Sequence, residues 1–336
     1  MIVSARAHAR AGLAGNPSDG YHGRVVAFPV RNFSARVTLW DSEVLNIVAS
    51  PQHDPRRFDS LHDLATSAQR LGYYGGVRLL LATCKRFWEF CREREIALPT
   101  KNFTLSYTTD IPRQVGLAGS SAIIVAALEA LMAFHGLDET AIPKPVLPSL
   151  ALSVEREELL IAGGLQDRVV QVYDRLMYMD FGEEIMRRQG YGRYEPLEGV
   201  ALPPFAIAIS TDTRESGRIL SDLRFRWERG DPETRRLIAE LAACADAARE
   251  ALLAGDRKAL GEAMVANFGL RRRLLGDEVI GRPTLRMIEI AREVGVPAHL
   301  PGSSGSALCL LANDEQAAAL ERRFREAGCE FVRVRV

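Results

Sequence analysis

Short segments rich in β-branched and apolar residues, each of the length of a strand, recur along this chain of 336 residues. Residues 102–108 alternate between apolar and polar, as a strand that buries one face does, and residues 307–311 are apolar throughout, as a buried strand is. We predict strands at residues 2–10, 24–33, 34–40, 44–48, 102–108, 176–180, 205–211, 307–311 and 330–336.

Other segments repeat their apolar residues about every 3.6 positions, which predicts helices. The pattern is clearest in residues 76–94, where Leu79, Leu80, Phe87 and Phe90 lie near this period. Helices are also predicted at residues 60–70, 148–162 and 315–326, in an apolar segment that ends near residue 135, and in several segments between residues 211 and 293, and a helix or turn is predicted at residues 168–173.

Strands and helices mix without a regular βαβ alternation. This favours an α+β fold class with two domains over a doubly wound parallel sheet. Residues 190–204 are rich in glycine, proline and charge and show no clear period. We place the domain boundary there, which gives domains at residues 1–200 and 201–336.

Lysine plus arginine and aspartate plus glutamate number 43 each, so no net charge favours nucleic acid or an acidic membrane surface. The five cysteines form no CxxC pair and no zinc-type cluster, so we interpret them as small apolar core residues in a reducing compartment. No apolar run reaches the roughly 18 residues of a membrane span. The N-terminus does not look like a signal peptide. We expect a cytoplasmic protein.

Residues 116–122 combine closely spaced glycines, a serine pair and an apolar helix that begins directly afterwards. Glycines let backbone N–H groups approach an anion, and a helix N-terminus adds the positive end of its dipole. A serine in the first turn can ligate a magnesium ion that bridges phosphates. The predicted phosphate-binding residues are Gly116, Leu117, Ala118, Gly119, Ser120, Ser121 and Ala122.

The alternative for this segment is an ordinary loop with Ser120 or Ser121 as the helix N-cap. No lysine follows it in the P-loop arrangement, which disfavours a P-loop enzyme. Nor does a G-x-G-x-x-G motif follow a strand, which disfavours a dinucleotide-binding oxidoreductase.

A second group of residues can supply carboxylates. Glu155 and Glu158 lie three positions apart in a predicted helix and so share a face, and the Gly163-Gly164 break lets the chain bring Asp167 back toward it. Phosphoryl transfer needs one carboxylate for magnesium and another to orient or accept the proton of the acceptor hydroxyl. The alternatives are a solvated helix face for Glu155 and an N-cap role for Asp167.

Two loops carry weaker signals. Arg10 precedes the turn Asn16-Pro17-Ser18-Asp19, a combination that can bind sugar hydroxyls or simply form a turn. Residues 301–306 form a small-residue loop that is either a second wall of a phosphate site or a tight connection. The predicted phosphate contacts in this loop are Gly302, Ser303 and Ser304.

These four segments, in this order, resemble the GHMP kinases. The central motif of that family is a proline, three variable residues, Gly-Leu and then Ser-Ser-Ala, which this chain matches at Pro112, Gly116, Leu117, Ser120, Ser121 and Ala122. With Ala118-Gly119 between the two parts, the loop is one residue longer than in mevalonate kinases. The stretches at residues 9–19, 72–80, 102–107, 111–121 and 162–173 look most like the members that phosphorylate D-glucuronate at its anomeric oxygen. The resemblance implies the two-domain GHMP kinase fold, with a left-handed βαβ unit in the N-terminal domain and a ferredoxin-like C-terminal domain.

The resemblance also implies site residues. The catalytic aspartate of the family falls on Asp167 and its basic partner on Arg10. Its magnesium ligands fall on Ser121 and on Glu155, with Glu158 as the second choice for the glutamate.

The sugar-contacting positions fall on Asp19 and Asn16. Asn16 stands where galactokinases have a glutamate, which argues against galactose. A uronate carboxylate also needs a cationic partner, and a bidentate arginine suits it best. Arg24, Arg113 and Arg168 are the candidates, and sequence alone does not choose among them.

The implied activity is that of an ATP- and Mg²⁺-dependent sugar-1-kinase, which gives glucuronate 1-phosphate and ADP. One alternative is a GHMP kinase for galacturonate, a neutral sugar or a mevalonate-like alcohol. Another is a non-catalytic sugar or nucleotide sensor on the same scaffold. The expected partner is a small molecule, neither nucleic acid nor membrane, and the oligomeric state is open.

Overall fold

The computed structural model describes residues 1–54, 58–64, 66, 75–211 and 220–336. Residues 65 and 67–70 of the predicted helix at residues 60–70, and residues 72–74 of one resembling stretch, lie outside these residues. The chain forms two compact units. Unit 1 comprises Met1–Ala9, Phe33–Ile111 and Ala118–Asp174, and unit 2 comprises Arg10–Asn32, Pro112–Leu117 and Arg175–Val336. The predicted boundary near residue 200 stays a prediction.

Two long strands begin the chain, β1 (Ile2–Ala14) and β2 (Arg24–Asp41), and they pair with each other. We predicted two strands, at residues 24–33 and 34–40, where the structure has the single strand β2. In unit 1, the second half of β2 pairs antiparallel with β4 (Phe103–Thr109). Strand β3 (Asn46–Ile47) pairs parallel with β4.

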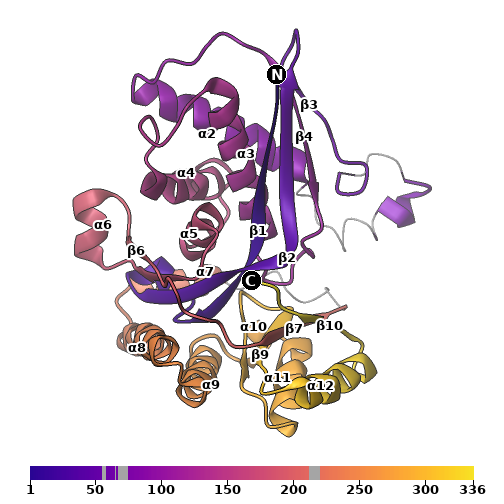
Figure 1. Ribbon diagram of the computed structural model, residues 1–336, viewed down its shortest axis with the longest axis vertical. Helices are drawn as coiled ribbons and strands as arrows, with labels where there is room; N and C mark the ends of the chain where they lie inside the picture. The colour runs from indigo at the N-terminus through magenta and orange to yellow at the C-terminus, as the bar shows by residue number, and fades with distance from the viewer. Residues whose placement is uncertain (55–57, 65, 67–74, 212–219) are drawn as a thin grey trace. The chain divides into compact units, whose positions relative to one another are not determined.

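Helix α2 (Gly76–Glu93) lies between β3 and β4 in the chain, so this part of unit 1 is a βαβ unit. It packs on α3 (Gly119–His135), which buries most of its side chains because its sequence is apolar on every face. Helices α4 (Leu147–Ser153) and α5 (Gln166–Tyr173) complete the group (Figure 1). The predicted extent of α2 and the predicted end of α3 near residue 135 are confirmed.

The predicted helix at residues 148–162 is wrong in its second half. Helix α4 ends at Ser153 and continues as a π-helical turn over Val154–Glu158, after which residues 159–162 are not helical. A π turn adds a residue to the turn and so rotates the side chains that follow. This rotation decides which way the two predicted glutamates face.

In unit 2, the first half of β2 pairs with β5 (Met177–Asp180), and β5 pairs with β6 (Arg193–Pro196). Helix α6 (Glu183–Gln189) connects β5 to β6. Neither α6 nor β6 was predicted, because both are short and mostly polar.

The rest of unit 2 holds an antiparallel sheet with the order β10 (Cys329–Arg333), β7 (Phe205–Ser210), β9 (Ser306–Leu310), β8 (Ala298–His299). Together with α11 (Arg282–Glu293) and α12 (Asp314–Glu326), these strands form the ferredoxin-like arrangement that the resemblance implied. Its core is formed by apolar side chains of both helices and of β7 and β9. The helices α7 (Leu220–Glu228), α8 (Pro232–Ala254), α9 (Arg257–Leu275) and α10 (Asp277–Ile280) precede α11 in the chain.

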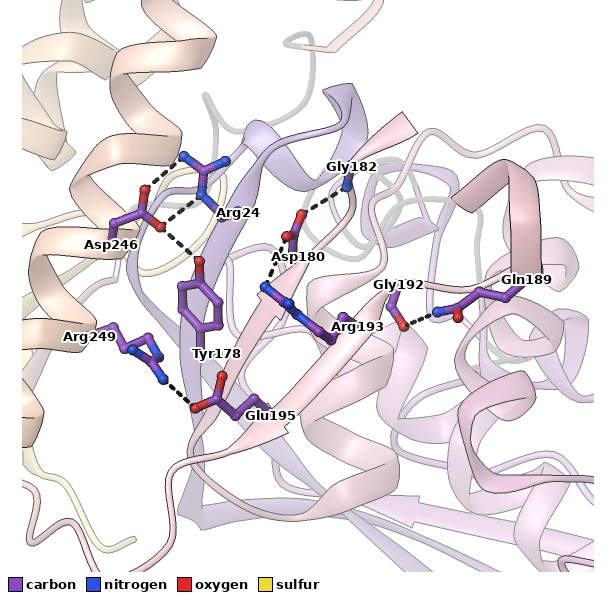
Figure 2. A network of polar contacts seen from close by, with 10 residues as sticks. All are labelled: Arg24, Tyr178, Asp180, Gly182, Gln189, Gly192, Arg193, Glu195, Asp246 and Arg249. Carbon is purple, nitrogen blue, oxygen red and sulfur yellow. Dashed lines mark hydrogen bonds and ion pairs between the residues drawn. The ribbon is translucent and has the colours of Figure 1, made fainter. Parts of the chain in front are cut away.

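Polar contacts connect α8 to the strands of unit 2 (Figure 2). Arg24 on β2 donates two hydrogen bonds to Asp246 on α8, each of 2.7 Å, and the Tyr178 hydroxyl donates to the same carboxylate at 2.7 Å. Beside them, Arg249 pairs with Glu195 at 2.5 Å and lies 5.2 Å from the centre of the Tyr178 ring. Burial and the bond to Asp246 raise the pKa of Tyr178, so the hydroxyl remains a donor at neutral pH.

All five cysteines are free thiols, as predicted, and Cys91, Cys244 and Cys309 are buried. Among the described residues, none of the helices combines the length and the apolar character that crossing a bilayer requires.

Candidate functional site

The predicted phosphate loop leads directly into helix α3. Gly116 and Ala118 have left-handed backbones, with φ of 72° and 63°, and they turn the chain on either side of buried Leu117. Ala118 is the N-cap and its side chain makes no capping bond, so the interpretation of Ser120 or Ser121 as N-cap is wrong. The first N–H groups of α3 therefore have no intrahelical acceptor and are available to an anion.

The two serines of the motif face different ways. Ser121 is buried and its Oγ donates to the carbonyl of Ala118 at 3.1 Å. Ser120 is exposed, and its Oγ donates to Glu155 Oε1 at 2.7 Å. The serine hydroxyl that contacts the predicted metal-binding glutamate is thus that of Ser120, one residue before the predicted ligand.

Glu155 is only 2% exposed, so the solvated-face alternative for it is wrong. Its second carboxylate oxygen pairs with the buried guanidinium of Arg168. Glu158 instead pairs with Lys85 on α2. The π turn separates the two glutamates, and Glu155 has the more enclosed environment.

Asp167 lies in the first turn of α5, where Leu165 is the N-cap, so the N-cap alternative for Asp167 is wrong. Its carboxylate lies 3.2 Å from Arg168 Nη1, which also donates to the carbonyl of Gly164 at 2.7 Å. The guanidinium of Arg168 therefore contacts both Asp167 and Glu155.

Helix α5 is also connected to the phosphate loop. Gln171 Nε2 donates to the carbonyl of Ala118 at 2.9 Å. Unit 1 thus brings together five predicted site residues: Ser120, Ser121, Glu155, Asp167 and Arg168.

The donor set of unit 1 suits Mg²⁺. Among the described residues there is no cluster of three or more metal-binding side chains. Mg²⁺ does not need one, because it usually keeps several waters and takes one or two carboxylates together with phosphate oxygens. The buried carboxylate of Glu155 beside a serine hydroxyl meets that requirement.

The other predicted site residues belong to unit 2. Arg10 is 4% exposed, and its Nη1 donates to the carbonyl of Pro301 at 2.5 Å and approaches that of Gly116 at 3.5 Å. Asn16 Nδ2 donates to the carbonyl of Leu300 at 3.2 Å. Asp19 is buried in a short 3₁₀ helix, Ser18–Tyr21.

The two small-residue loops of unit 2 touch through their backbones. A Cβ on Gly302 would lie 1.9 Å from the carbonyl oxygen of Gly116, and a Cβ on Gly116 would lie 2.9 Å from the nitrogen of Ser303. Ser306 Oγ donates to the carbonyl of Val115 at 2.6 Å. The sequence predicted both loops, but it gave no sign that they are neighbours.

The candidate arginines for a uronate carboxylate differ in their surroundings. The guanidinium of Arg24 already faces Asp246 with two donors, as Figure 2 shows. That of Arg168 is paired with Glu155. Arg113 lies in the Pro112–Leu117 segment of unit 2, three residues before Gly116.

Sequence reasoning missed a buried polar cluster in unit 2. Asn267 Oδ1 on α9 accepts from the backbone N–H of Gly15 at 2.8 Å, and Asn267 Nδ2 approaches His299 Nδ1 at 3.4 Å. Burial, together with the nearby charge of Arg271, lowers the pKa of His299 to about 3, so its ring is neutral at physiological pH. Arg271, also on α9, is buried and donates to carbonyls of the 300–303 loop. No sequence motif identifies these residues.

Comparison with known proteins gives a consistent result. The family model of the GHMP kinases N terminal domain matches residues 80–175, and that of the GHMP kinases C terminal matches residues 248–328. Glucuronokinase 1 of Arabidopsis thaliana is 42% identical over 335 residues, which cover 99% of this chain and 92% of that protein. Probable glucuronokinase 2 of the same plant is 44% identical over 329 residues, covering 97% and 89%.

Among solved structures, the phosphomevalonate kinase of Streptococcus pneumoniae has a TM-score of 0.74 to this chain. The two are 15% identical, and the match covers 99% of this chain and 100% of the other. At that identity the likeness establishes a shared fold.

Proposed function

Because this chain belongs to the GHMP kinases, we propose that it transfers a phosphoryl group from ATP to the anomeric hydroxyl of D-glucuronate. The observation that carries the proposal is the identity of 42% and 44% to two glucuronokinases over nearly the whole chain. A match of that length includes the sugar-end segments, residues 9–19, as well as the phosphate motif.

We propose that the phosphates of ATP bind to residues 116–122. Two features of the loop support this: its left-handed turns at Gly116 and Ala118, and the unpaired N–H groups at the start of α3. The contact between Gly116 and Gly302 supports a second phosphate wall at Gly302, Ser303 and Ser304.

Glu155, with the hydroxyl of Ser121 or Ser120, is the proposed magnesium site. Glu155 is favoured over Glu158 because it is buried beside a motif serine, whereas Glu158 pairs with Lys85. When bound with ATP, the ion would neutralise part of the phosphate charge.

Asp167 is the proposed general base. Its carboxylate would accept a hydrogen bond from the anomeric hydroxyl and take up its proton as the new O–P bond forms. The contact with Arg168 holds this carboxylate in place at the start of α5. Arg10, held by the carbonyl of Pro301, would stabilise the charge that develops in the transition state.

We propose Asn16 and Asp19 as sugar-hydroxyl contacts, because both are buried polar residues of one turn in unit 2. Of the three arginines considered for the carboxylate, Arg113 is our choice, because it belongs to unit 2 together with Asn16 and Asp19 and lies three residues before Gly116. A cytoplasmic location and a domain boundary near residue 200 remain predictions from the sequence.

The test is a coupled assay of ADP release with ATP and Mg²⁺ against glucuronate, galacturonate, glucose, galactose and mevalonate. The expected result is turnover that strongly favours glucuronate. Preference for another acceptor would keep the kinase and overturn the uronate. Binding of ATP without turnover of any acceptor would favour a sensor on the kinase scaffold.

A further inference from the structure

Arg271 is a buried cation whose partners are backbone carbonyls. It lies on α9 and is 2% exposed. Its Nη1 donates to the carbonyl of Leu300 at 2.8 Å, and its Nη2 donates to that of Gly302 at 2.7 Å and approaches that of Ser303 at 3.4 Å. Among the described residues, no carboxylate lies within ion-pair distance of this guanidinium.

The remaining carbonyl of the loop is also held by cationic and backbone donors. The oxygen of Pro301 accepts from Arg10 Nη1 at 2.5 Å and from the N–H of Gly12 at 2.8 Å. The carbonyls of residues 300–303 are therefore all bound on the side of Arg10 and Arg271.

Peptide geometry then fixes where the amides of this loop point. In a trans peptide the C=O and the following N–H point in opposite directions. The carbonyls of Pro301, Gly302 and Ser303 face the arginines, so the N–H groups of Gly302, Ser303 and Ser304 face away from them. The nitrogen of Ser303 lies next to Gly116, where it would be 2.9 Å from an added Cβ.

These three amides have no acceptor within the part of the chain that the structure describes. The next amide, that of Gly305, does have one, the hydroxyl of Thr284 at 3.0 Å. Ser304 adds a hydroxyl that is buried and likewise lacks a partner among the described residues. Consecutive unpaired N–H groups are the usual means by which a loop binds an anion.

The positive charge of Arg271 also favours binding of an anion at this loop. Burial and the nearby Arg10 lower the pKa of Arg271 to about 10, with Asp19 partly opposing them. The guanidinium therefore remains protonated at neutral pH. Its positive charge is only partly offset, and it lies directly behind the loop.

We infer that Arg271 is a positioning residue for nucleotide phosphate: it binds the carbonyls of residues 300, 302 and 303 so that three amide donors face the phosphate groups beside Gly116. The inference rests on the proposed use of ATP but not on the identity of the acceptor. Lysine cannot replace this side chain, because a single ammonium group cannot reproduce a planar fork that reaches several carbonyls.

The test compares Arg271→Lys with Arg272→Lys, a neighbour on α9 whose guanidinium pairs with exposed Asp277 instead. Affinities for ATP and for adenosine are measured by calorimetry on the full chain. We expect Arg271→Lys to weaken the binding of ATP by about tenfold or more and the binding of adenosine by less than about twofold, because only ATP carries phosphate. Arg272→Lys should change neither.

If a folded Arg271→Lys variant lost affinity for ATP and adenosine equally, or lost affinity for neither, the inference would be overturned. A purely structural role would not affect ATP binding more than adenosine binding. Hydrogen exchange on the unmodified protein tests the same point without a variant. ATP should protect the amides of residues 302–304 and adenosine should not, and absence of that protection also overturns it. If ATP protects these amides in the wild-type protein but the protein does not phosphorylate glucuronate, the proposed acceptor alone is overturned.

Discussion

At the scale of single residues, the proposed chemistry depends most on Asp167. Asparagine keeps the shape of the side chain but cannot accept a proton. Because a general base contributes about 10²–10⁴-fold, Asp167→Asn should lower kcat by at least about 100-fold. ATP binding should survive, because the proposed phosphate contacts lie elsewhere in the chain.

Steady-state kinetics and calorimetry with ATP separate these two effects. Asp314→Asn makes the same change at an exposed position, where the carboxylate pairs with Arg333, and it should leave both values unchanged. An Asp167→Asn variant with nearly full turnover would remove Asp167 from the mechanism.

Glu129 on α3 predicts a pH dependence of stability. Burial raises the pKa of Glu129 to about 7 from a reference of 4.5, with Lys144 opposing and Asp174 adding to the shift. The folded-state pKa is above the unfolded one, so the protein is most stabilised when this carboxyl is protonated, and that stabilisation is lost as pH rises through about 7.

Glu129→Gln removes the ionisation while keeping the shape of the side chain. We expect the variant to gain about 1–3 kcal/mol in free energy of unfolding at pH 8.5 relative to wild type, and little at pH 5. Urea unfolding at the two pH values measures the difference. An equal effect at both would mean that Glu129 does not titrate in this range.

Sequence reasoning named proposed site residues that belong to a family motif and missed the buried polar residues that do not. Glu155 and Asp167 could be named because the resemblance places the magnesium-binding glutamate and the catalytic aspartate of the family on them. Arg271 could not, because it stands in the run Arg271-Arg272-Arg273, where nothing distinguishes the buried member from its exposed neighbours. The burial of one arginine depends on how α9 packs on β8 and on the loop after it, and that is information about tertiary structure.

At the scale of elements, the contact between the two small-residue loops requires a glycine at position 302, and this requirement can be tested. A methyl group at this position would overlap the carbonyl oxygen of Gly116, and backbone atoms cannot move aside as a flexible side chain can. Gly302→Ala should therefore separate the loops, raise the KM for ATP by about tenfold or more, and lower the free energy of unfolding by about 1–3 kcal/mol.

Gly269→Ala is the matched control. It lies within α9, and an added Cβ there would meet no atom within 4 Å. Alanine is the better helix former, so this variant should be more stable than wild type by about 0.5–1 kcal/mol with unchanged kinetics. Thermal unfolding and ATP titrations distinguish the two variants. Unchanged ATP kinetics in Gly302→Ala would show that close approach of the loops is not needed.

Elements with a long and regular pattern were predictable, and short or locally distorted ones were not. Helix α3 was predicted because its sequence is mostly apolar over a length that suits a helix better than a strand. The end of α4 was predicted too late, because a π turn has the same composition as an α turn. Strand β6 and helix α6 are each a few polar residues long, and their structure depends on pairing with β5 and on a glycine at each end of the helix.

At the scale of the whole molecule, the chain crosses repeatedly between its two units, and the proposed site residues are divided between them. The central motif itself is divided after Leu117. A sequence pattern shows the order of such segments but does not show which of them share a unit. The assignment of each segment to a unit depends on contacts between residues that are far apart in the chain, and these are visible only in the structure.

The last prediction concerns how the molecule distinguishes a uronate from a neutral sugar. We propose Arg113 as the carboxylate partner, so Arg113→Lys should lower the ratio of kcat/KM for glucuronate to that for glucose by about tenfold or more. Arg24→Lys should leave this ratio within about twofold, because the two donors of Arg24 are committed to Asp246 (Figure 2).

The ratio is measured with both sugars in competition, so that a change in the amount of active enzyme cancels. Arg168→Lys is not informative here, since it would disturb the buried carboxylate of Glu155 as well. If Arg24→Lys lowers the ratio and Arg113→Lys does not, the carboxylate binds at Arg24, and its pair with Asp246 must open when the sugar arrives.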